Sequence, residues 1–192
     1  MRRFAYARPT SLEEAIALLE EHGPEASVLA GGTDLVLGLR GGWSRPEVVV
    51  DLKRVPELAP AIAEEGAGLS ISARTVMTDI IEDARVQKRL PALAEAAVVV
   101  GSVQIRNRAT LAGNICNCSP AADTAPPLLV YGASMVIAGP AGVRRVPVED
   151  FMLGPGRTAL ERGELVIAIE VPYPEEPYGA AYVRHTRRQG TD

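Results

Sequence analysis

The sequence has little of what marks several common classes of protein. Aromatic residues make up 4% of its 192 positions and the formal net charge is −4, so it lacks the stacking platforms and the basic surface that nucleic acids require. No apolar run approaches the roughly 20 residues that span a bilayer, and the N-terminal MRRFAYARPTSLEEA turns polar before an apolar signal region develops. We therefore expect a cytoplasmic protein that binds no nucleic acid and has no membrane span.

Cysteine and histidine are equally scarce. Cys116 and Cys118 are one residue apart, which is a poor spacing for a structural disulfide and at best half of a metal site. His22 and His185 lie far apart in the sequence, and neither has a nearby Ser or Cys to form a nucleophile and base pair. No G-x-S-x-G elbow is present. The sequence predicts no metal site and no catalytic residue of its own.

The chain does have enough apolar sequence for a folded core, since 47% of its residues are hydrophobic and 23% are charged. The periodicity predicts a helix over residues 10–22, which Thr10 or Ser11 caps. ASVLA at 26–30 predicts a short buried strand, and after the glycine turn a helical or irregular segment extends through Leu39. EVVVDL at 47–52 predicts a second strand. Strand, helix and strand in succession predict a small βαβ unit with parallel pairing.

After residue 56 the pattern changes. GAGLSISART predicts a strand that leads into the helix TVMTDIIED, and LPALAEAAVVVG predicts a further helix. ASMVIAG and VRRVPVEDFM predict a hairpin around Gly139-Pro140, and ELVIAIEVPY is the strongest strand signal. These elements predict an α+β second lobe. The C-terminal GAAYVRHTRRQGTD is strand-like in its first half and then basic, which fits either a frayed terminus or a point where a further domain or a partner continues.

The first candidate site is the stretch LAGGTDLVLGLR, residues 29–40. Gly31 and Gly32 allow positive φ angles and a close approach to the backbone. Thr33 and Asp34 can cap the segment that follows. The stretch fits either an ordinary strand-to-helix turn or a nest of backbone N–H groups that binds a phosphate.

The second candidate site lies in residues 101–130, GSVQIRNRATLAGNICNCSPAADTAPPLLV, which is too long and too mixed in composition for a plain loop. TLAGN, like AGGTD, combines small residues with polar residues that can present hydrogen-bonding groups and bare backbone donors. The two nests together suit a pyrophosphate. Asp123 is of the right type to accept hydrogen bonds from ribose hydroxyls. The alternatives are that Asn114 occupies a left-handed turn position and that Asp123 caps a helix starting near Ala125.

A third glycine motif, GPGRTA at residues 154–159, formally matches the G-x-G-x-x-A dinucleotide fingerprint. Pro155 lies inside the turn, no buried strand precedes it, and barely two turns of helix fit before Gly163. We interpret this motif as a loop. The chain offers a cofactor site more readily than its own acid and base, which suggests that a bound cofactor performs the chemistry.

Taken together, LAGGTDLVLGLR and the 101–130 segment resemble the flavin-binding subunit of the molybdenum hydroxylases, the family of xanthine dehydrogenase and aerobic carbon monoxide dehydrogenase. The resemblance extends over essentially the whole chain, from FAYARPTSLEEAIALL to ELVIAIEVPY. It implies an α+β, two-lobed FAD-binding fold of the vanillyl-alcohol oxidase type. Residues 1–55 would form a small parallel βαβ lobe and residues 56–178 a larger, mostly antiparallel lobe, while 179–192 would begin a C-terminal domain that the chain otherwise lacks.

The resemblance also assigns residues to the FAD site. The first loop would lie against the pyrophosphate, the second loop would complete the nest, Asp123 would lie near the ribose, Gly101 and Ser102 near the flavin, and the backbone of Leu165 and Val166 at the adenine. The two loops comprise Leu29, Ala30, Gly31, Gly32, Thr33, Asp34 and Leu35, and Thr110, Leu111, Ala112, Gly113 and Asn114. Ala112 replaces a glycine of many relatives. Because the first loop has no His or Cys, we expect FAD to be bound non-covalently.

The function implied is electron transfer: this subunit would pass electrons from an iron-sulfur subunit through FAD to NAD, a quinone or another acceptor. A molybdopterin-containing large subunit and a 2Fe-2S small subunit are the expected partners, and a dimer of heterotrimers is a possible assembly. Two alternatives stay open. One is a free-standing FAD-dependent oxidoreductase, and the other is a non-catalytic, truncated assembly or binding module.

Overall fold

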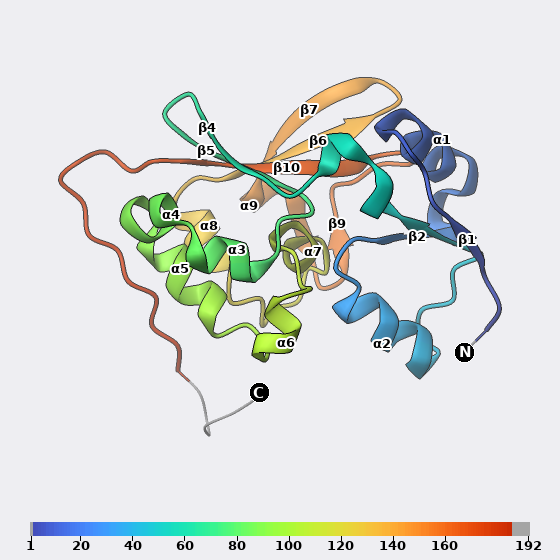
Figure 1. Cartoon of the computed structure of the whole chain (residues 1–192), viewed down its shortest axis with the longest axis horizontal. Coiled ribbons are helices and arrows are strands. Elements are labelled where there is room, and N and C mark those ends of the chain that lie inside the picture. Colours follow the sequence, from blue (N-terminus) through green and yellow to red (C-terminus); the bar gives the residue numbers. More distant parts are fainter. Residues whose placement is uncertain (1, 186–192) are drawn as a thin grey trace.

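The structure is a computed structural model that describes residues 2–185, and it combines a parallel sheet with antiparallel sheets (Figure 1). A three-stranded sheet has the order β1-β3-β2, a five-stranded sheet the order β4-β5-β10-β6-β7, and β8 and β9 form a separate hairpin. The strands are β1 Ala5–Ala7, β2 Ala26–Leu29, β3 Val48–Asp51, β4 Ile62–Glu65, β5 Gly68–Ser72, β6 Ser134–Gly139, β7 Gly142–Pro147, β8 Met152–Gly154, β9 Arg157–Thr158 and β10 Leu165–Pro172.

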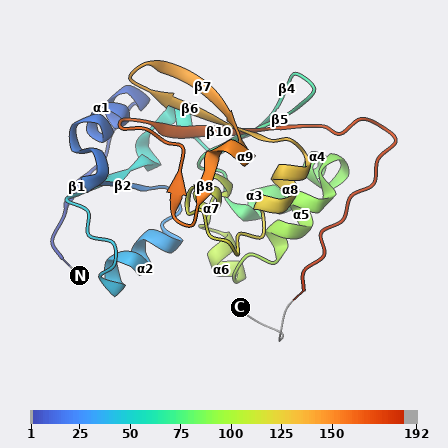
Figure 2. The same cartoon turned by 180° about the vertical axis from the view of Figure 1, so that it is seen from behind.

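Helices connect these strands and cover one side of the five-stranded sheet, where α3 to α8 lie together in both views (Figures 1 and 2). The α-helices are α1 Leu12–His22, α2 Thr33–Gly41, α3 Met77–Glu82, α4 Ala84–Arg89, α5 Pro91–Val98, α6 Val103–Arg106, α7 Leu111–Cys116, α8 Ala125–Val130 and α9 Val148–Phe151. Single turns of 3-10 helix are η1 Gly23–Glu25, η2 Leu52–Arg54 and η3 Pro56–Leu58. Among residues 2–185, no helix has the length and apolar character required to cross a membrane.

The small sheet confirms the predicted βαβ unit. Strands β2 and β3 pair in parallel, with Leu29 opposite Asp51, and α2 connects them. All four residues of β3 are buried, as expected of a central β-branched strand. Helix α1 begins after Ser11, whose side chain accepts a hydrogen bond from the Glu14 amide. Strand β1 was not predicted, because three mostly exposed residues show no alternation.

The large sheet is centred on β10, which pairs antiparallel with β5 on one side and with β6 on the other. The predicted β6–β7 hairpin is present, with Gly139 opposite Gly142. GPGRTA forms the turn and second strand of the β8–β9 hairpin, so its interpretation as a loop is confirmed. The inner face of the sheet and the helices enclose the larger apolar core, in which Phe151 and Leu128 are fully buried.

Strand β10 belongs to both apolar cores. Its first residue, Leu165, packs with Leu52 and Leu58 in the core of the small sheet, while Val166 and Ile169 belong to the core of the large sheet. Residues on both sides of position 55 therefore share the smaller core. The division of the chain into lobes at that position stays a prediction.

The segment after β10 is not a strand. Residues 179–185 have no regular structure, so the strand-like interpretation of their sequence is wrong. The chain instead runs along the outside of α4 and α5 in both views (Figures 1 and 2), where Tyr178 Oη donates to the Arg89 carbonyl at 3.0 Å and the Tyr182 amide donates to Glu95 Oε2 at 2.6 Å. Its polar groups bond to helices rather than to a strand edge. The remainder of the predicted C-terminal region, residues 186–192, lies outside the described residues.

Arg162, in the loop before β10, connects α1 to the large sheet. Its Nε donates to the Glu20 carbonyl at 2.6 Å and its Nη2 donates to the Glu21 carbonyl at 2.8 Å. Both acceptors lie in the last turn of α1, where carbonyls have no helical donor and a positive charge is favourable. The guanidinium thus caps the C-terminal end of α1.

Asp51, at the carboxyl end of β3, is 4% exposed and connects β3 to β1. It accepts hydrogen bonds from Tyr6 Oη at 2.5 Å and from Lys53 Nζ at 2.8 Å. Burial raises the pKa of Asp51, but the hydrogen bonds from Lys53 and Tyr6 outweigh it and bring the pKa below its usual value. The carboxylate is therefore the stable form, and it ties the two strands at the edge where the first loop begins.

We expect Arg162→Ala to lower the free energy of unfolding by about 1 kcal/mol, because two carbonyls at the end of α1 lose a charged donor. Urea denaturation followed by circular dichroism measures the change. Arg157→Ala, an exposed arginine of β9, is the matched control. Equal denaturation midpoints for the two variants would show that the contact contributes nothing.

We expect the effect of Asp51→Asn on stability to depend on pH. Because the folded pKa of Asp51 lies below the unfolded value of about 3.9, its ionised form contributes stability that is complete above that value and is lost as the pH falls towards the folded pKa. Asp51→Asn should lower the urea midpoint at pH 7, and the difference from the unmodified chain should shrink below about pH 3.9. A difference that stays constant down to pH 3 would contradict this assignment.

Candidate functional site

The first loop, residues 30–32, leads from β2 into the N-terminus of α2. Gly32 adopts a left-handed conformation with φ 84°, and no side chain caps the helix. The first helical hydrogen bond runs from the Val36 amide to the Gly32 carbonyl at 3.0 Å. The amides of Thr33, Asp34 and Leu35 therefore precede the helical ladder, as in helix ends that bind anions.

The second loop is organised by Thr110. Its Oγ1 accepts a hydrogen bond from the Gly113 amide at 3.0 Å and so caps α7. The Leu111 amide donates to the Thr75 carbonyl at 3.3 Å, which fixes the start of α7 against the segment before α3. Within residues 2–185 the Ala112 amide forms no hydrogen bond. The second loop thus also presents a backbone donor at the start of a helix.

The two loops, nearly eighty positions apart in sequence, meet backbone to backbone. A Cβ atom on Gly31 would overlap the Arg108 carbonyl oxygen and would lie 3.2 Å from Ala109 Cα. The approach is possible only because residue 31 is a glycine. The Ala109 carbonyl in turn accepts from the Met77 amide at 2.9 Å. The structure therefore brings together the two nests that the sequence predicts, with Gly31 as the point of contact.

Asp123 is held by the segment that follows β10. Its Oδ1 accepts from Tyr182 Oη at 2.7 Å and lies 3.3 Å from Arg184 Nε, and the side chain is 15% exposed. The sequence did not predict this contact, because 59 positions separate Tyr182 from Asp123.

Both alternatives for the second site are wrong. Asn114 lies within α7 rather than at a left-handed position, and its Oδ1 accepts from Thr124 Oγ1 at 2.6 Å. A helix does start at Ala125, but its N-cap is Thr124 and not Asp123. The side chain of Asp123 is therefore not needed for helix capping.

Leu165 and Val166 lie at the start of β10, where one backbone edge is open. They pair with Ala138 and Ile137 of β6. On the opposite side, the pairing with β5 begins only at Ala168. Over residues 2–185, no strand pairs with this edge at Leu165 and Val166, which are both buried, and their backbone contact with the adenine stays a prediction.

Gly101 and Ser102 form an exposed turn between α5 and α6. Gly101 has φ 50°, and Ser102 Oγ accepts from the Ile105 amide at 3.4 Å. Arg106 Nη1 donates to the Gly101 carbonyl at 3.2 Å. The single turn of α6 separates this position from the second loop, so its predicted place beside the flavin is untested.

The two cysteines are free thiols. Burial raises the pKa of Cys116 to about 12 and also raises the pKa of Cys118. Both are protonated at neutral pH and are therefore poor nucleophiles and poor metal ligands. In the part of the chain that the structure describes, no cluster of three or more potential ligands could hold a metal ion.

The arrangement fits a dinucleotide. Two helix starts with open amides and glycine-rich backbone suit a diphosphate, and the carboxylate of Asp123 suits hydroxyl groups. By contrast, the groups gathered here include no paired acid and base. The arrangement therefore suits the binding of a cofactor.

Comparison with known proteins agrees with a dinucleotide-binding role. The sequence profile of the family described as FAD binding domain in molybdopterin dehydrogenase matches residues 2–174. The chain is 40% identical over 189 residues to the xanthine dehydrogenase FAD-binding subunit of Escherichia coli O157:H7, covering 98% of this chain and 64% of that protein. It is also 40% identical to the carbon monoxide dehydrogenase medium chain of Hydrogenophaga pseudoflava, covering 98% and 65% of the two chains.

Solved structures give the same result. Carbon monoxide dehydrogenase from Hydrogenophaga pseudoflava superimposes with a TM-score of 0.93 at 40% identity, over 98% of this chain and 66% of that one. Quinoline 2-oxidoreductase from Pseudomonas putida 86 superimposes with a TM-score of 0.85 at 35% identity, over 90% of this chain and 60% of that one. The chain thus spans somewhat less than two thirds of these relatives, and it belongs to the family of FAD binding domains of molybdopterin dehydrogenases.

Proposed function

We propose that this chain is the FAD-carrying electron-transfer subunit of a molybdenum hydroxylase complex. The observation that carries the proposal is the contact of Gly31 with the Arg108 carbonyl, because it brings the loop before α2 against the segment before α7. The relatives named above are called FAD-binding subunit and medium chain, which supports a role as one part of a larger enzyme.

The amides of Thr33, Asp34 and Leu35 and the start of α7 would hold the diphosphate of FAD. Both contacts to Asp123 go to Oδ1, and a carboxylate has a second acceptor oxygen for a ribose hydroxyl. FAD, when bound, supplies the redox chemistry, because flavins accept and release electrons. The chain binds the cofactor non-covalently, since both its thiols are protonated and none lies in the first loop.

The remaining predicted contacts complete the site. The backbone of Leu165 and Val166 would meet the adenine, and Gly101 and Ser102 would lie near the flavin ring. Hydrogen-bond donors around the ring and the diphosphate set the orientation and the potential of a bound flavin.

Electrons would enter from a 2Fe-2S subunit, after hydroxylation at a molybdopterin-containing subunit, and leave to NAD, a quinone or another acceptor. Anaerobic addition of a hydroxylase substrate separates this function from that of a free-standing oxidoreductase. Oxidised flavins absorb at about 450 nm. In the proposed function, this absorbance bleaches in the complex and not in the isolated chain. Bleaching in the isolated chain would favour the free-standing enzyme.

We expect Gly31→Val to weaken FAD retention at least tenfold while the chain stays folded. The added side chain separates the two loops, because it occupies the position of the Arg108 carbonyl. A displacement that removes a few hydrogen bonds to FAD lowers the affinity for FAD about tenfold or more. Absorbance after desalting measures FAD retention, and far-ultraviolet circular dichroism checks the fold.

Gly179→Ala is the matched control, since a Cβ there meets no atom within 4 Å and the residue has no positive φ. Unchanged FAD retention in a folded Gly31→Val chain would refute the loop assignment. An unmodified chain that folds yet takes up no FAD, alone or with its companion subunits, would instead favour a non-catalytic assembly module.

A further inference from the structure

The C-terminal end of α2 carries an exposed apolar group that the cofactor site does not use. Trp43, the only tryptophan of the chain, follows the end of α2 and is 74% exposed, and Leu37 on α2 is 55% exposed. We call these two residues the α2 patch. Exposed single apolar residues are common, but an exposed tryptophan near an exposed leucine is typical of a contact surface.

The indole of Trp43 is held in place by glycines. A Cβ on Gly41 would overlap the six-membered ring of Trp43, and a Cβ on Gly38 would lie 3.1 Å from its Nε1. Glycine inside a helix lowers helix stability relative to alanine. The two glycines therefore lower the stability of the helix, and they leave room for an aromatic ring that remains mostly exposed to solvent.

The turn that carries the indole is also fixed by hydrogen bonds. The Gly42 and Ser44 amides both donate to the Gly38 carbonyl, at 2.9 and 3.2 Å. Arg45 Nε donates to the Gly42 carbonyl at 2.6 Å. The ring is thus pre-organised before any partner arrives, which reduces the entropy lost on binding.

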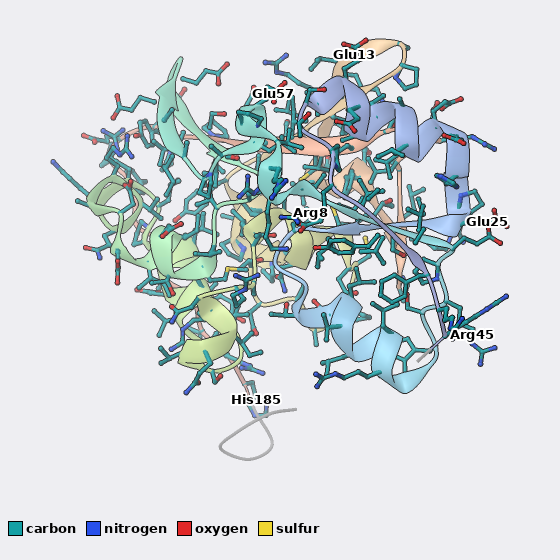
Figure 3. All side chains as sticks on the ribbon, turned by 45° about the vertical axis from the view of Figure 1, so that its right-hand side comes forward. Arg8, Glu13, Glu25, Arg45, Glu57 and His185 are labelled. Carbon is teal, nitrogen blue, oxygen red and sulfur yellow. The ribbon has the colours of Figure 1, made fainter. Side chains whose placement is uncertain are left out.

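Exposed arginines lie close to Trp43 in the sequence. Arg40 and Arg45 flank Trp43 within three positions and are both exposed, and Arg45 lies beyond the end of α2 beside the N-terminal chain (Figure 3). The Ala5 amide donates to the Glu47 carbonyl at 2.7 Å, which holds the N-terminal segment against the residues that follow Arg45. Arg2 and Arg3 of this segment are also exposed. Among the described residues, none of these four arginines forms an ion pair with an acidic side chain. In a chain of net charge −4 this is a local excess of positive charge.

We propose that the α2 patch is a docking surface for a companion subunit that presents an apolar pocket rimmed by carboxylates. The proposal rests on the proposed function, which requires companion chains. Tryptophan and arginine are the residues most enriched at the energetic centres of protein interfaces. The arginine rim complements carboxylates and would repel a second copy of the same patch, so the partner is a different surface.

The experiment compares variants of the affinity-tagged chain, isolated together with its companion subunits from its source organism. Trp43→Ala should reduce the yield of assembled complex about tenfold or more, as expected of an interface hot spot. Gly41→Ala keeps the indole but removes its seat, so it should reduce assembly by a smaller factor. Replacing both Arg40 and Arg45 by Glu should weaken assembly and reduce its dependence on salt concentration.

Val130→Ala, which changes another highly exposed apolar residue at the end of α8, is the control and should assemble normally. All variants should retain FAD as the unmodified chain does, which separates this proposal from the proposed function. Full assembly of Trp43→Ala would overturn the docking surface. Loss of FAD in that variant would also overturn it, because the patch would then belong to the cofactor site.

Two further measurements decide between occupants. A dimer of the isolated chain in light scattering, lost in Trp43→Ala, would assign the patch to a second copy and overturn the proposal. A blue shift of the Trp43 emission with phosphatidylcholine and phosphatidylglycerol vesicles, absent with phosphatidylcholine alone, would assign it to an anionic lipid surface instead. We expect neither result. Absence of any companion chain beside the unmodified, FAD-bearing chain would overturn the docking proposal and leave FAD binding intact.

Discussion

The close contact between Gly31 and the Arg108 carbonyl is the constraint on which the candidate site depends. It joins the loop that follows β2 of the small sheet to the segment before α7, one of the helices beside the large sheet, and the two are far apart in the sequence. Without it, α2 and α7 would each present a few open amides to solvent, and neither would be more than an ordinary capped turn. With it, the loop before α2 and the segment before α7 lie against each other, which supports a shared role in binding a diphosphate.

The rest of the fold keeps this contact in register. Strand β10 begins in the small core at Leu165 and continues into the large core, and Arg162, just before it, binds the end of α1. Since the carboxyl ends of the three parallel strands share one edge of the small sheet, the hydrogen bonds of Asp51 to Tyr6 and Lys53 stabilise the edge from which the first loop starts. These side chains therefore stabilise the candidate site without having to contact a cofactor.

Much of this could be predicted from the sequence, because its strongest signals are local. The Ser11 cap, the β-branched run of β3 and the alternation in β10 each identify an element within a few residues. The features that escaped prediction depend on distant partners. Strand β1 has no pattern of its own and exists because β3 offers an open edge. The hydrogen bond from Tyr182 to Asp123 likewise follows from tertiary packing.

Helix α2 connects the two proposals physically. Its N-terminal amides lie at the candidate cofactor site, while nine residues away its C-terminal end holds the Trp43 ring on Gly38 and Gly41. On this helix Leu39 is buried, while Gly38 lies against the Trp43 ring. The two surfaces lie at opposite ends of one helix, so a companion subunit can seat on the α2 patch without contacting the diphosphate. Assembly and cofactor retention therefore depend on different residues of the same element.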